Sequence, residues 1–221
     1  MIGAAELASD RTRALKLVPV SHETAERLDL FVNIFLRWQR AVQLVAPSTL
    51  KSLWTRHIAD SLQLLEHAPD ARVWADLGSG GGFPGLIIAI ALTGRPGAMV
   101  HLIESDSRKA AFLREASRLT QAPAKVHNER IESAAKQIGK VDVVTARALA
   151  PLPKLIELAM PFLAADIPGI FLKGQDVDSE LTEAAKYRRV KAKVLPSRTD
   201  PGGKVVIIEN GPHQPLTEHS P

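Results

Sequence analysis

The sequence predicts an α/β fold in which a mostly parallel sheet ends in an antiparallel hairpin, with a helical cap at the N-terminus. Three observations support this prediction. An apolar strand at residues 73–77 runs through a glycine-rich turn into an apolar helix. Further short apolar strands then alternate with helical patterns, which is typical of a parallel sheet covered by helices. Two β-rich stretches at residues 189–195 and 205–209 flank a turn-forming segment, as in a hairpin.

The first 70 residues are expected to form a helical extension that packs on the core. Residues 22–40 carry large apolar side chains at helical spacing, and residues 53–65 predict a second helix. The apolar residues of the first pattern are Leu28, Phe31, Phe35 and Trp38. The α/β domain is expected over residues 71–211, and the proline-containing tail 212–221 is expected to be disordered.

The turn after the first strand contains five glycines within eight residues, namely Gly78, Gly80, Gly81, Gly82 and Gly85. Because glycine has no Cβ, such a turn can adopt positive φ and let the backbone come close to a ligand. Pro84 suits the first turn of the helix that follows over residues 86–92. We therefore expect a ligand at this turn.

The identity of that ligand depends on Asp76. Gly80, Gly82 and Gly85 also fit the spacing of dinucleotide-binding turns. However, a carboxylate at the end of the strand would repel a pyrophosphate and attract a cationic group. S-adenosylmethionine carries an ammonium and a sulfonium, so the pattern favours a methyl donor over a dinucleotide, and either ligand over a turn that binds nothing.

The second strand, residues 100–104, ends in another acidic residue, Glu104. It follows the glycine turn by about twenty residues, where an acidic side chain can accept both hydroxyls of a ribose. Both cofactor classes use that contact. Ser105, Asp106 and Ser107 then supply N-caps for the next helix.

The remaining elements favour the methyl donor. Further strands are expected at residues 125–127, 141–145 and 170–173, with helices at 154–163 and 178–189. Dinucleotide-binding folds usually continue with parallel units to the end of the sheet. A parallel sheet finished by an antiparallel hairpin is instead the architecture of methyltransferases, which is an argument by fold analogy.

Composition excludes several classes of chemistry. The chain has 221 residues, which allows one substantial core. It has no cysteine, which excludes disulfides, zinc-thiolate sites and methylation of pyrimidine C5 through a cysteine adduct. The seven histidines show no metal-ligand spacing, so we expect no metal. No segment has the length of a membrane span or the pattern of a signal peptide, so we expect a cytoplasmic protein without a membrane partner.

Basic residues suggest a polyanionic partner. The formal net charge is +4, and the lysines and arginines form three clusters. Any one cluster is most simply a solvated helix face, but the three together favour nucleic acid. The clusters are Arg11, Arg13 and Lys16; Arg37, Arg40, Lys51 and Arg56; and Lys186, Arg188, Arg189, Lys191 and Lys193. From the last cluster we take Lys186, Arg188 and Arg189 as candidate RNA contacts.

Five motifs accompany the glycine turn and its Phe83-Pro-Gly85 end. They are Arg56-His-Ile-Ala-Asp-Ser-Leu62, Glu104-Ser105 followed by Lys109 and Phe112-Leu113, Arg130-Ile-Glu132, Thr145-Ala-Arg-Ala148 and Leu172-Lys-Gly174. In this combination the chain resembles the ribosomal RNA small-subunit methyltransferase G family, also called the glucose-inhibited division protein B family, over roughly residues 25–210. The resemblance implies a class I S-adenosylmethionine-dependent methyltransferase fold, which is Rossmann-like.

The resemblance also implies an activity and a set of site residues. The reaction would transfer a methyl group from S-adenosylmethionine to N7 of a guanine in the decoding-region loop of 16S rRNA, with the RNA or the small subunit as partner of a monomer. By position, donor binding would fall on Gly78, Phe83, Ile131, Glu132 and Arg147, beside Asp76, Gly80 and Glu104. The chain departs from the family at Trp38-Gln39 and Gln43-Leu44-Val45, where asparagines are usual.

The chemistry of the acceptor limits what the protein must supply. Guanine N7 has a lone pair and no hydrogen, so methylation needs no general base, and positioning must dominate. Arg147, at the carboxyl edge of the sheet, is the candidate catalytic residue that touches donor and target. Lys173 is expected to be either a neighbouring RNA contact or a solvated strand end. The Asn/Asp-Pro-Pro-Tyr/Phe motif of exocyclic amine methylation does not follow the fourth strand.

A polar trio within an apolar helical pattern has two interpretations. His57, Asp60 and Ser61 could form a hydrogen-bonded brace between cap and body or a wall of the substrate pocket, and we favour the brace. Two other functions stay open. An NAD(P)-dependent oxidoreductase would use the same glycines, and a non-enzymatic RNA-binding protein would keep the basic clusters without a donor site.

Overall fold

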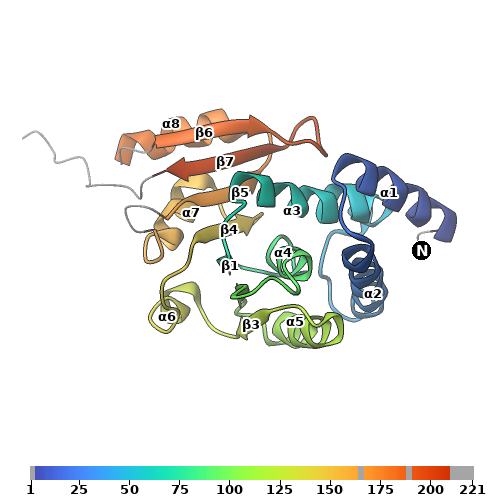
Figure 1. Ribbon diagram of the computed structural model, residues 1–221. Coiled ribbons are helices and arrows are strands. Elements are labelled where there is room, and N and C mark those ends of the chain that lie inside the picture. Colours follow the sequence, from blue (N-terminus) through green and yellow to red (C-terminus); the bar gives the residue numbers. More distant parts are fainter. Residues whose placement is uncertain (1–2, 164–166, 188–190, 210–221) are drawn as a thin grey trace, which may run out of the picture.

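The computed structural model describes residues 3–163, 167–187 and 191–209. Within these residues seven strands form one sheet in the order β3-β2-β1-β4-β5-β7-β6 (Figure 1). The strands are β1 Val73–Leu77, β2 Met99–Ile103, β3 Ala124–His127, β4 Val143–Arg147, β5 Gly169–Lys173, β6 Lys191–Pro196 and β7 Lys204–Glu209. Strands β1 to β5 are parallel, whereas β7 is antiparallel to both β5 and β6. The predicted parallel sheet with a terminal hairpin is therefore confirmed.

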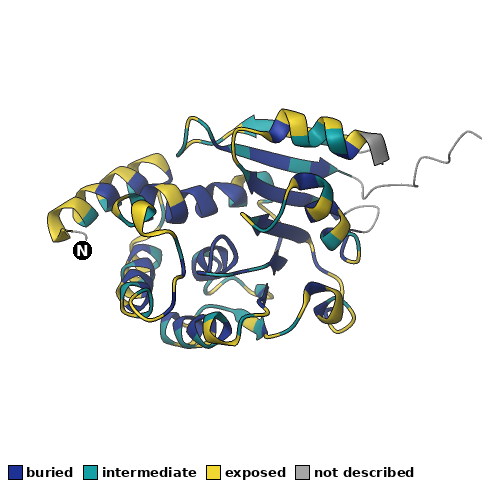
Figure 2. Ribbon diagram, turned by 180° about the vertical axis from the view of Figure 1, so that it is seen from behind, coloured by how far each residue is buried: buried dark blue, intermediate teal, exposed yellow. Residues whose placement is uncertain are grey.

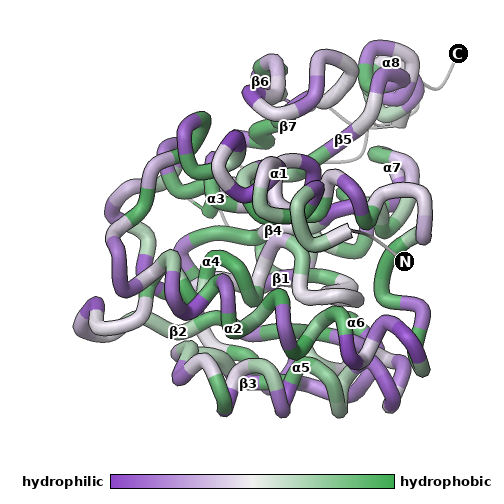
Figure 3. Tube along the Cα trace, turned by 90° about the vertical axis from the view of Figure 1, so that its right-hand side faces the viewer, coloured by the Kyte–Doolittle hydropathy of each residue, from purple (hydrophilic) through white to green (hydrophobic). Residues whose placement is uncertain are grey.

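Helices cover both faces of this sheet. They are α1 Ala4–Leu17, α2 His22–Trp38, α3 Asp60–Leu62, α4 Gly85–Ala91, α5 Ser107–Thr120, α6 Ile131–Ala134, α7 Leu152–Ala159 and α8 Val177–Tyr187, with shorter turns η1 Pro47–Ser52, η2 Leu53–Ala59 and η3 Gln63–His67. In Figure 3, hydrophobic and hydrophilic residues alternate along α2 and α5, as expected for helices with one buried face. Among the described helices, none has the length and apolar content needed to cross a membrane.

Alternation along the strands divides the core into two clusters. One face of the sheet, with Trp74 and Leu102, packs on α4, α5 and the N-terminal helices. The other face, with Leu77 and Phe171, packs on α6, α7 and α8. Figure 2 shows buried residues along the central strands and exposed residues on the outer sides of the helices. Because the first cluster includes both cap and sheet residues, the N-terminal helices share the core of the α/β body.

Two local predictions were wrong. Residues 53–65 form no single helix, because π-helix, a short α-helix and 3-10 helix follow one another, and Ser61 Oγ donates to the His57 carbonyl at 2.6 Å inside the segment. The fourth strand begins at Val143 and not at residue 141, since Asp142 uses its carboxylate to accept the N–H groups of Arg72 and Val73. Helix α1 lies within the predicted helical extension, although no pattern in the sequence had indicated it as a separate helix. The tail 212–221 lies outside the described residues.

Candidate functional site

A cleft of about 580 Å³ opens at the carboxyl ends of the central strands. Most of its walls come from five segments: the glycine turn after β1, the end of β2, residues 129–132 after β3, the end of β4, and parts of residues 44–57 from the cap. Lys109 of α5 and Leu158 of α7 add single side chains. This is the edge at which open α/β sheets bind their ligands. The cap therefore supplies one side of the cleft and the sheet supplies the other.

The glycine turn is built as its composition predicts. Gly80 has a φ of +51°, a conformation that favours glycine, and its N–H donates to Glu104 Oε2 at 2.9 Å. Gly85 is required for a different reason, because a Cβ there would lie 2.4 Å from Asp76 Cβ. Gly78, Gly80 and Phe83 all line the cleft. The turn thus offers closely approachable backbone to the cavity.

Glu104 lies directly after β2 and also lines the cleft. Its side chain joins two loops, since Oε2 accepts from Gly80 and Oε1 accepts the Asp106 N–H at 2.7 Å. Asn128 donates to the Glu104 carbonyl and so ties the end of β3 to the same point. The predicted acidic residue therefore lies at the cleft and fixes its geometry.

Asp76 does not occupy the predicted place. Its side chain is fully buried, does not line the cleft, and accepts the Gly85 N–H through Oδ2 at 3.1 Å. Burial raises the pKa of Asp76 to about 7. The other oxygen, Oδ1, has no hydrogen-bond partner among the described residues. Asp76 therefore holds the start of α4 behind the turn, because its side chain points toward α4 and away from the cleft.

Ile131 and Glu132 begin α6 and line the side of the cleft near Glu104. Ile131 is buried and Glu132 is exposed. Arg130, which precedes them, is exposed on the same wall, and Lys109 reaches the cleft from α5. The site predictions did not include these two basic residues, although both lie inside the family motifs.

Arg147 is the last residue of β4 and lines the cleft. Its Nη1 lies 3.5 Å from Asp60 Oδ2, and 16% of its side chain is exposed. Burial lowers the pKa of Arg147, and the Asp60 carboxylate opposes that shift. Nη1 is buried without a hydrogen bond among the described residues, so the contact with Asp60 is an ion pair only. A guanidinium stays charged under these conditions.

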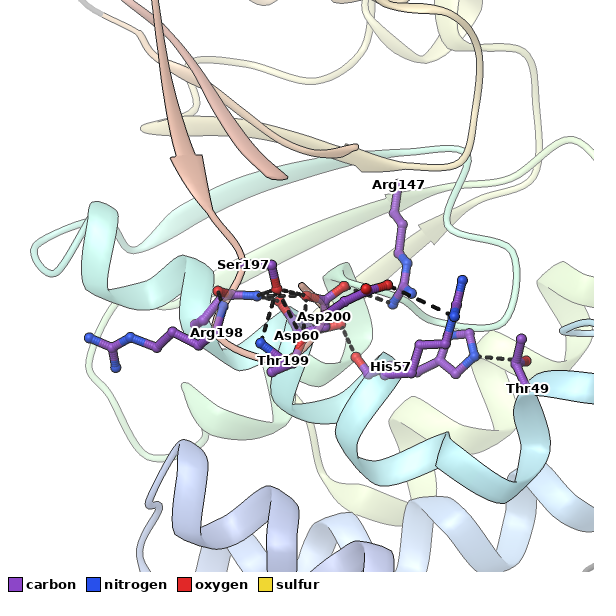
Figure 4. A network of polar contacts seen from close by, with 11 residues as sticks. Thr49, His57, Asp60, Arg147, Ser197, Arg198, Thr199 and Asp200 are labelled. Carbon is purple, nitrogen blue, oxygen red and sulfur yellow. Dashed lines mark hydrogen bonds and ion pairs between the residues drawn. The ribbon is translucent and has the colours of Figure 1, made fainter. Parts of the chain in front are cut away.

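His57, Asp60 and Ser61 do not share one role as brace or as pocket wall. Asp60 is a brace, because its Oδ1 accepts hydrogen bonds from Gln63 Nε2 at 2.6 Å, Ser197 Oγ at 2.8 Å and Thr199 Oγ1 at 2.7 Å (Figure 4). These bonds attach the cap to the loop between β6 and β7. Ser61 bonds within its own segment.

His57 instead forms part of the cleft wall. Its ring lies 4.9 Å from the Phe83 ring, centroid to centroid, and its Nε2 is 2.9 Å from Thr49 Oγ1. Burial, followed by the charges of Arg147 and Arg56, lowers the pKa of His57 to about 3. The ring is therefore neutral near pH 7.

Lys173 makes its contacts inside the fold, at the end of β5. Its Nζ lies 2.7 Å from Glu180 Oε2 and donates to the Ala150 carbonyl at 2.9 Å, with 10% of the side chain exposed. Glu180 Oε2 also accepts the Leu152 N–H at the start of α7. Lys173 is therefore not a solvated strand end, and its pairing with the carboxylate of α8 inside the fold argues against an RNA contact.

The basic clusters are partly engaged in internal contacts. Arg11 makes two hydrogen bonds to the Asp29 carboxylate, and Arg13 pairs with Asp10 at 2.8 Å. In the second cluster, Arg56 lies 3.8 Å from Asp200 and lines the cleft. Of the candidate RNA contacts, Lys186 lies in α8, and Arg188 and Arg189 lie outside the described residues.

One site residue was recognised in the sequence only as a departure. Gln39 Oε1 accepts the N–H groups of Leu44 and Val45 at 2.9 and 3.0 Å, and its Nε2 donates to the Val45 carbonyl at 2.9 Å. Residues 44–46 line the cleft, and Leu44 O would lie 3.1 Å from a Cβ placed on Gly81. Gln39 therefore shapes the cap side of the cleft.

Comparison with known proteins identifies the family. Residues 24–199 match the family model described as rRNA small subunit methyltransferase G, GidB. The chain belongs to this family. A Bradyrhizobium sp. (strain ORS 278) protein named ribosomal RNA small subunit methyltransferase G is 56% identical over 205 residues, covering 92% of each chain. The protein of that name from Rhodopseudomonas palustris (strain BisB18) is 50% identical over 217 residues, covering 98% of this chain and 92% of its own.

Solved structures agree on the fold of this methyltransferase G family member. An O-methyltransferase from Bacillus cereus in complex with SAH has a TM-score of 0.57 at 15% identity and covers 92% of this chain and 97% of its own. A mutant of MtNAS in complex with S-adenosylmethionine has a TM-score of 0.55 at 15% identity, covering 84% of this chain and 75% of its own. At such identities the likeness shows the fold alone, which is the class I methyltransferase fold.

Proposed function

We propose that this chain transfers a methyl group from S-adenosylmethionine to N7 of a guanine in the decoding-region loop of 16S rRNA. The observation that carries this proposal is the cleft itself, in which a glycine turn locked to Glu104 faces Arg147 in a member of the rRNA methyltransferase G family. S-adenosylmethionine supplies an electrophilic methyl group. The chain supplies a place to hold it and a place for the base.

The described residues fit such a donor. A cleft of about 580 Å³ is within the usual range for cofactor sites. Gly78 and Gly80 would hold the donor through close backbone approach, and Phe83 and Ile131 would give it apolar contact. Glu104 keeps acceptor capacity for ribose hydroxyls, because each carboxylate oxygen has two lone pairs and uses one on a backbone N–H. Glu132 stands on the same wall.

Charges near the cleft agree with an acceptor that loses no proton. His57 is a poor base with a pKa of about 3, and Asp76, whose pKa is about 7, does not line the cleft. Guanine N7 has no proton to lose, so methylation there does not require either group as a base. Arg147 would contact the base or the donor, and its task is positioning.

The partner we propose is 16S rRNA or the small ribosomal subunit. We propose that the protein acts as a monomer in the bacterial cytoplasm and needs no metal. Arg56 and Arg130 are exposed at the cleft and could meet phosphates. Among the described residues, no three or more histidine, aspartate or glutamate side chains are placed to hold a metal ion.

The test replaces the target guanine by 7-deazaguanine in an otherwise identical RNA, which removes the nucleophile and keeps the Watson–Crick edge. Binding should survive while transfer stops. The single-turnover rate on normal RNA should vary little between about pH 6.5 and 8.5, because no essential acid or base is involved. Methyl incorporation into the deaza substrate at the same position would refute N7 as the acceptor.

A further inference from the structure

Asp60 connects three parts of the chain that are distant in sequence. It lies in the cap and is 7% exposed, and it does not line the cleft. Its Oδ1 accepts bonds from Gln63 within the cap and from Ser197 and Thr199 in the β6–β7 loop. Its Oδ2 faces Arg147 at the end of β4 (Figure 4). One carboxylate therefore joins the cap, the hairpin loop and the sheet.

The two oxygens of Asp60 serve different purposes. Three hydrogen bonds to Oδ1 fix the plane of the carboxylate, since each donor approaches from a different residue. The carboxylate held in this way presents Oδ2 to Arg147 Nη1 at 3.5 Å. A buried pair of opposite charges interacts far more strongly than an exposed one, because less water screens it.

Arg147 meets Asp60 through a buried nitrogen that makes no hydrogen bond within the described part of the chain. Its Nη1 makes no hydrogen bond with any other described residue, and the Asp60 carboxylate is its ion-pair partner there. An arginine side chain has many rotamers, and fixing them costs conformational entropy. Arg56 and Asp200 form a second pair at the same rim with a longer separation of 3.8 Å.

We propose that Asp60 is a positioning residue for methyl transfer, which orients Arg147 at the cleft and holds the β6–β7 loop to the same point. This inference rests on the proposed function. It predicts that Asp60 affects the chemical step and leaves the binding of the donor intact, because the glycine turn and Glu104 are held by other bonds.

The test is Asp60→Asn, which keeps the size of the side chain and an oxygen acceptor but removes the charge that faces Arg147. Donor affinity, measured by calorimetry, should stay within about twofold of wild type. The single-turnover rate, normalised to the fraction of protein that binds donor, should fall about ten- to a hundredfold, the range expected when a group near the reacting atoms moves by about 1 Å. In an Arg147→Met background the same change should have little further effect, because the group it orients is already gone.

Two further variants make the result decisive. Thr199→Val removes one donor to Oδ1 and should lower the single-turnover rate about threefold, an effect of the size of one hydrogen bond. Glu66→Gln removes the ion pair of Glu66 with Arg198 on the outer side of the same loop, and should leave rate and affinity unchanged. If Asp60→Asn does not fold, Thr199→Val decides the question.

Wild-type transfer rates in both Asp60→Asn and Thr199→Val would overturn the proposal. So would a full additional loss from Asp60→Asn in the Arg147→Met background, or a parallel loss of donor binding, which would assign Asp60 to folding alone. Failure of the proposed function is a separate outcome, since the wild-type protein would then leave the RNA unmethylated.

Discussion

The Gly80 N–H donates to Glu104 Oε2 at 2.9 Å and so joins the glycine turn to the end of β2. The same carboxylate binds the N–H of Asp106, the N-cap of α5. The loops on both sides of the cleft therefore share one acidic side chain. Their geometry depends on its charge as well as on its position.

This contact predicts the behaviour of two variants. Gly80→Val should abolish donor binding, because a β-branched side chain is strained at a φ of +51°. Glu104→Gln keeps only one oxygen for two N–H groups and should weaken donor binding tenfold or more, since a hydrogen bond to a charged group contributes about 1.5 to 3 kcal/mol. Titration calorimetry measures both effects. Normal donor affinity in both variants would contradict the site assignment.

Asp76 predicts a pH-dependent stability. Its pKa is about 7 in the fold and ordinarily 3.8, so the folded protein holds a proton that the unfolded chain releases between these values. The stabilisation is present below about pH 4 and is lost as the pH rises through 7. Asp76→Asn should therefore gain stability relative to wild type by roughly 4 kcal/mol between pH 4 and pH 8. Urea unfolding of the donor-free proteins at several pH values measures this, and a pH-independent difference would show that Asp76 is ionised throughout.

A variant of Lys173 distinguishes a structural role of this lysine from contact with RNA. Lys173→Met leaves Glu180 without its cationic partner and should destabilise the fold by about 1 to 3 kcal/mol. The slope of log affinity for RNA against log salt should stay at the wild-type value. The comparison variant replaces Lys186, Arg188 and Arg189 by glutamine, and should flatten that slope if this cluster binds phosphates. If the slope fell by about one in Lys173→Met, Lys173 would be an RNA contact.

Gln39 should control the cap side of the cleft. Gln39→Leu removes the three hydrogen bonds that hold residues 44–45, so donor affinity should fall about tenfold through a looser wall. Gln43→Ala is the matched control, because Gln43 is exposed, does not line the cleft and also departs from the family pattern. Donor affinities are measured by calorimetry, and equal values in the two variants would show that Gln39 does not shape the donor site.

The parts of the fold that follow from local chemistry could be predicted. The glycine turn, the strand alternation and the Asp200-Pro-Gly-Gly203 hairpin turn each depend on residues close in sequence. Helix α1 could not be recognised, because only Asp10 and Ala14 are buried along it and its pattern is weakly amphipathic. Its Asp10 accepts the Trp54 N–H, a contact across 44 positions.

The site residues divide in the same way. Glu104 comes after its strand has ended, so its side chain reaches the cleft as predicted. Asp76 is still inside β1, and a helix covers its face of the strand. The sequence indicated a strand-end carboxylate in both cases and could not distinguish them. The ion pair of Lys173 could not be predicted, because its partner, Glu180, belongs to another element.

The hydrogen bonds of Asp60 span 137 and 139 positions to Ser197 and Thr199. A ribosome releases the cap long before it releases the β6–β7 loop, because the chain emerges from its N-terminus. Until that loop arrives, the Asp60 carboxylate lacks two of its three donors and Arg147 lacks a fixed partner. The cleft of this enzyme therefore depends on a segment that does not line it and that is synthesised after all of its walls. A nascent chain that has not reached residue 197 has its glycine turn but lacks the bonds that hold Asp60.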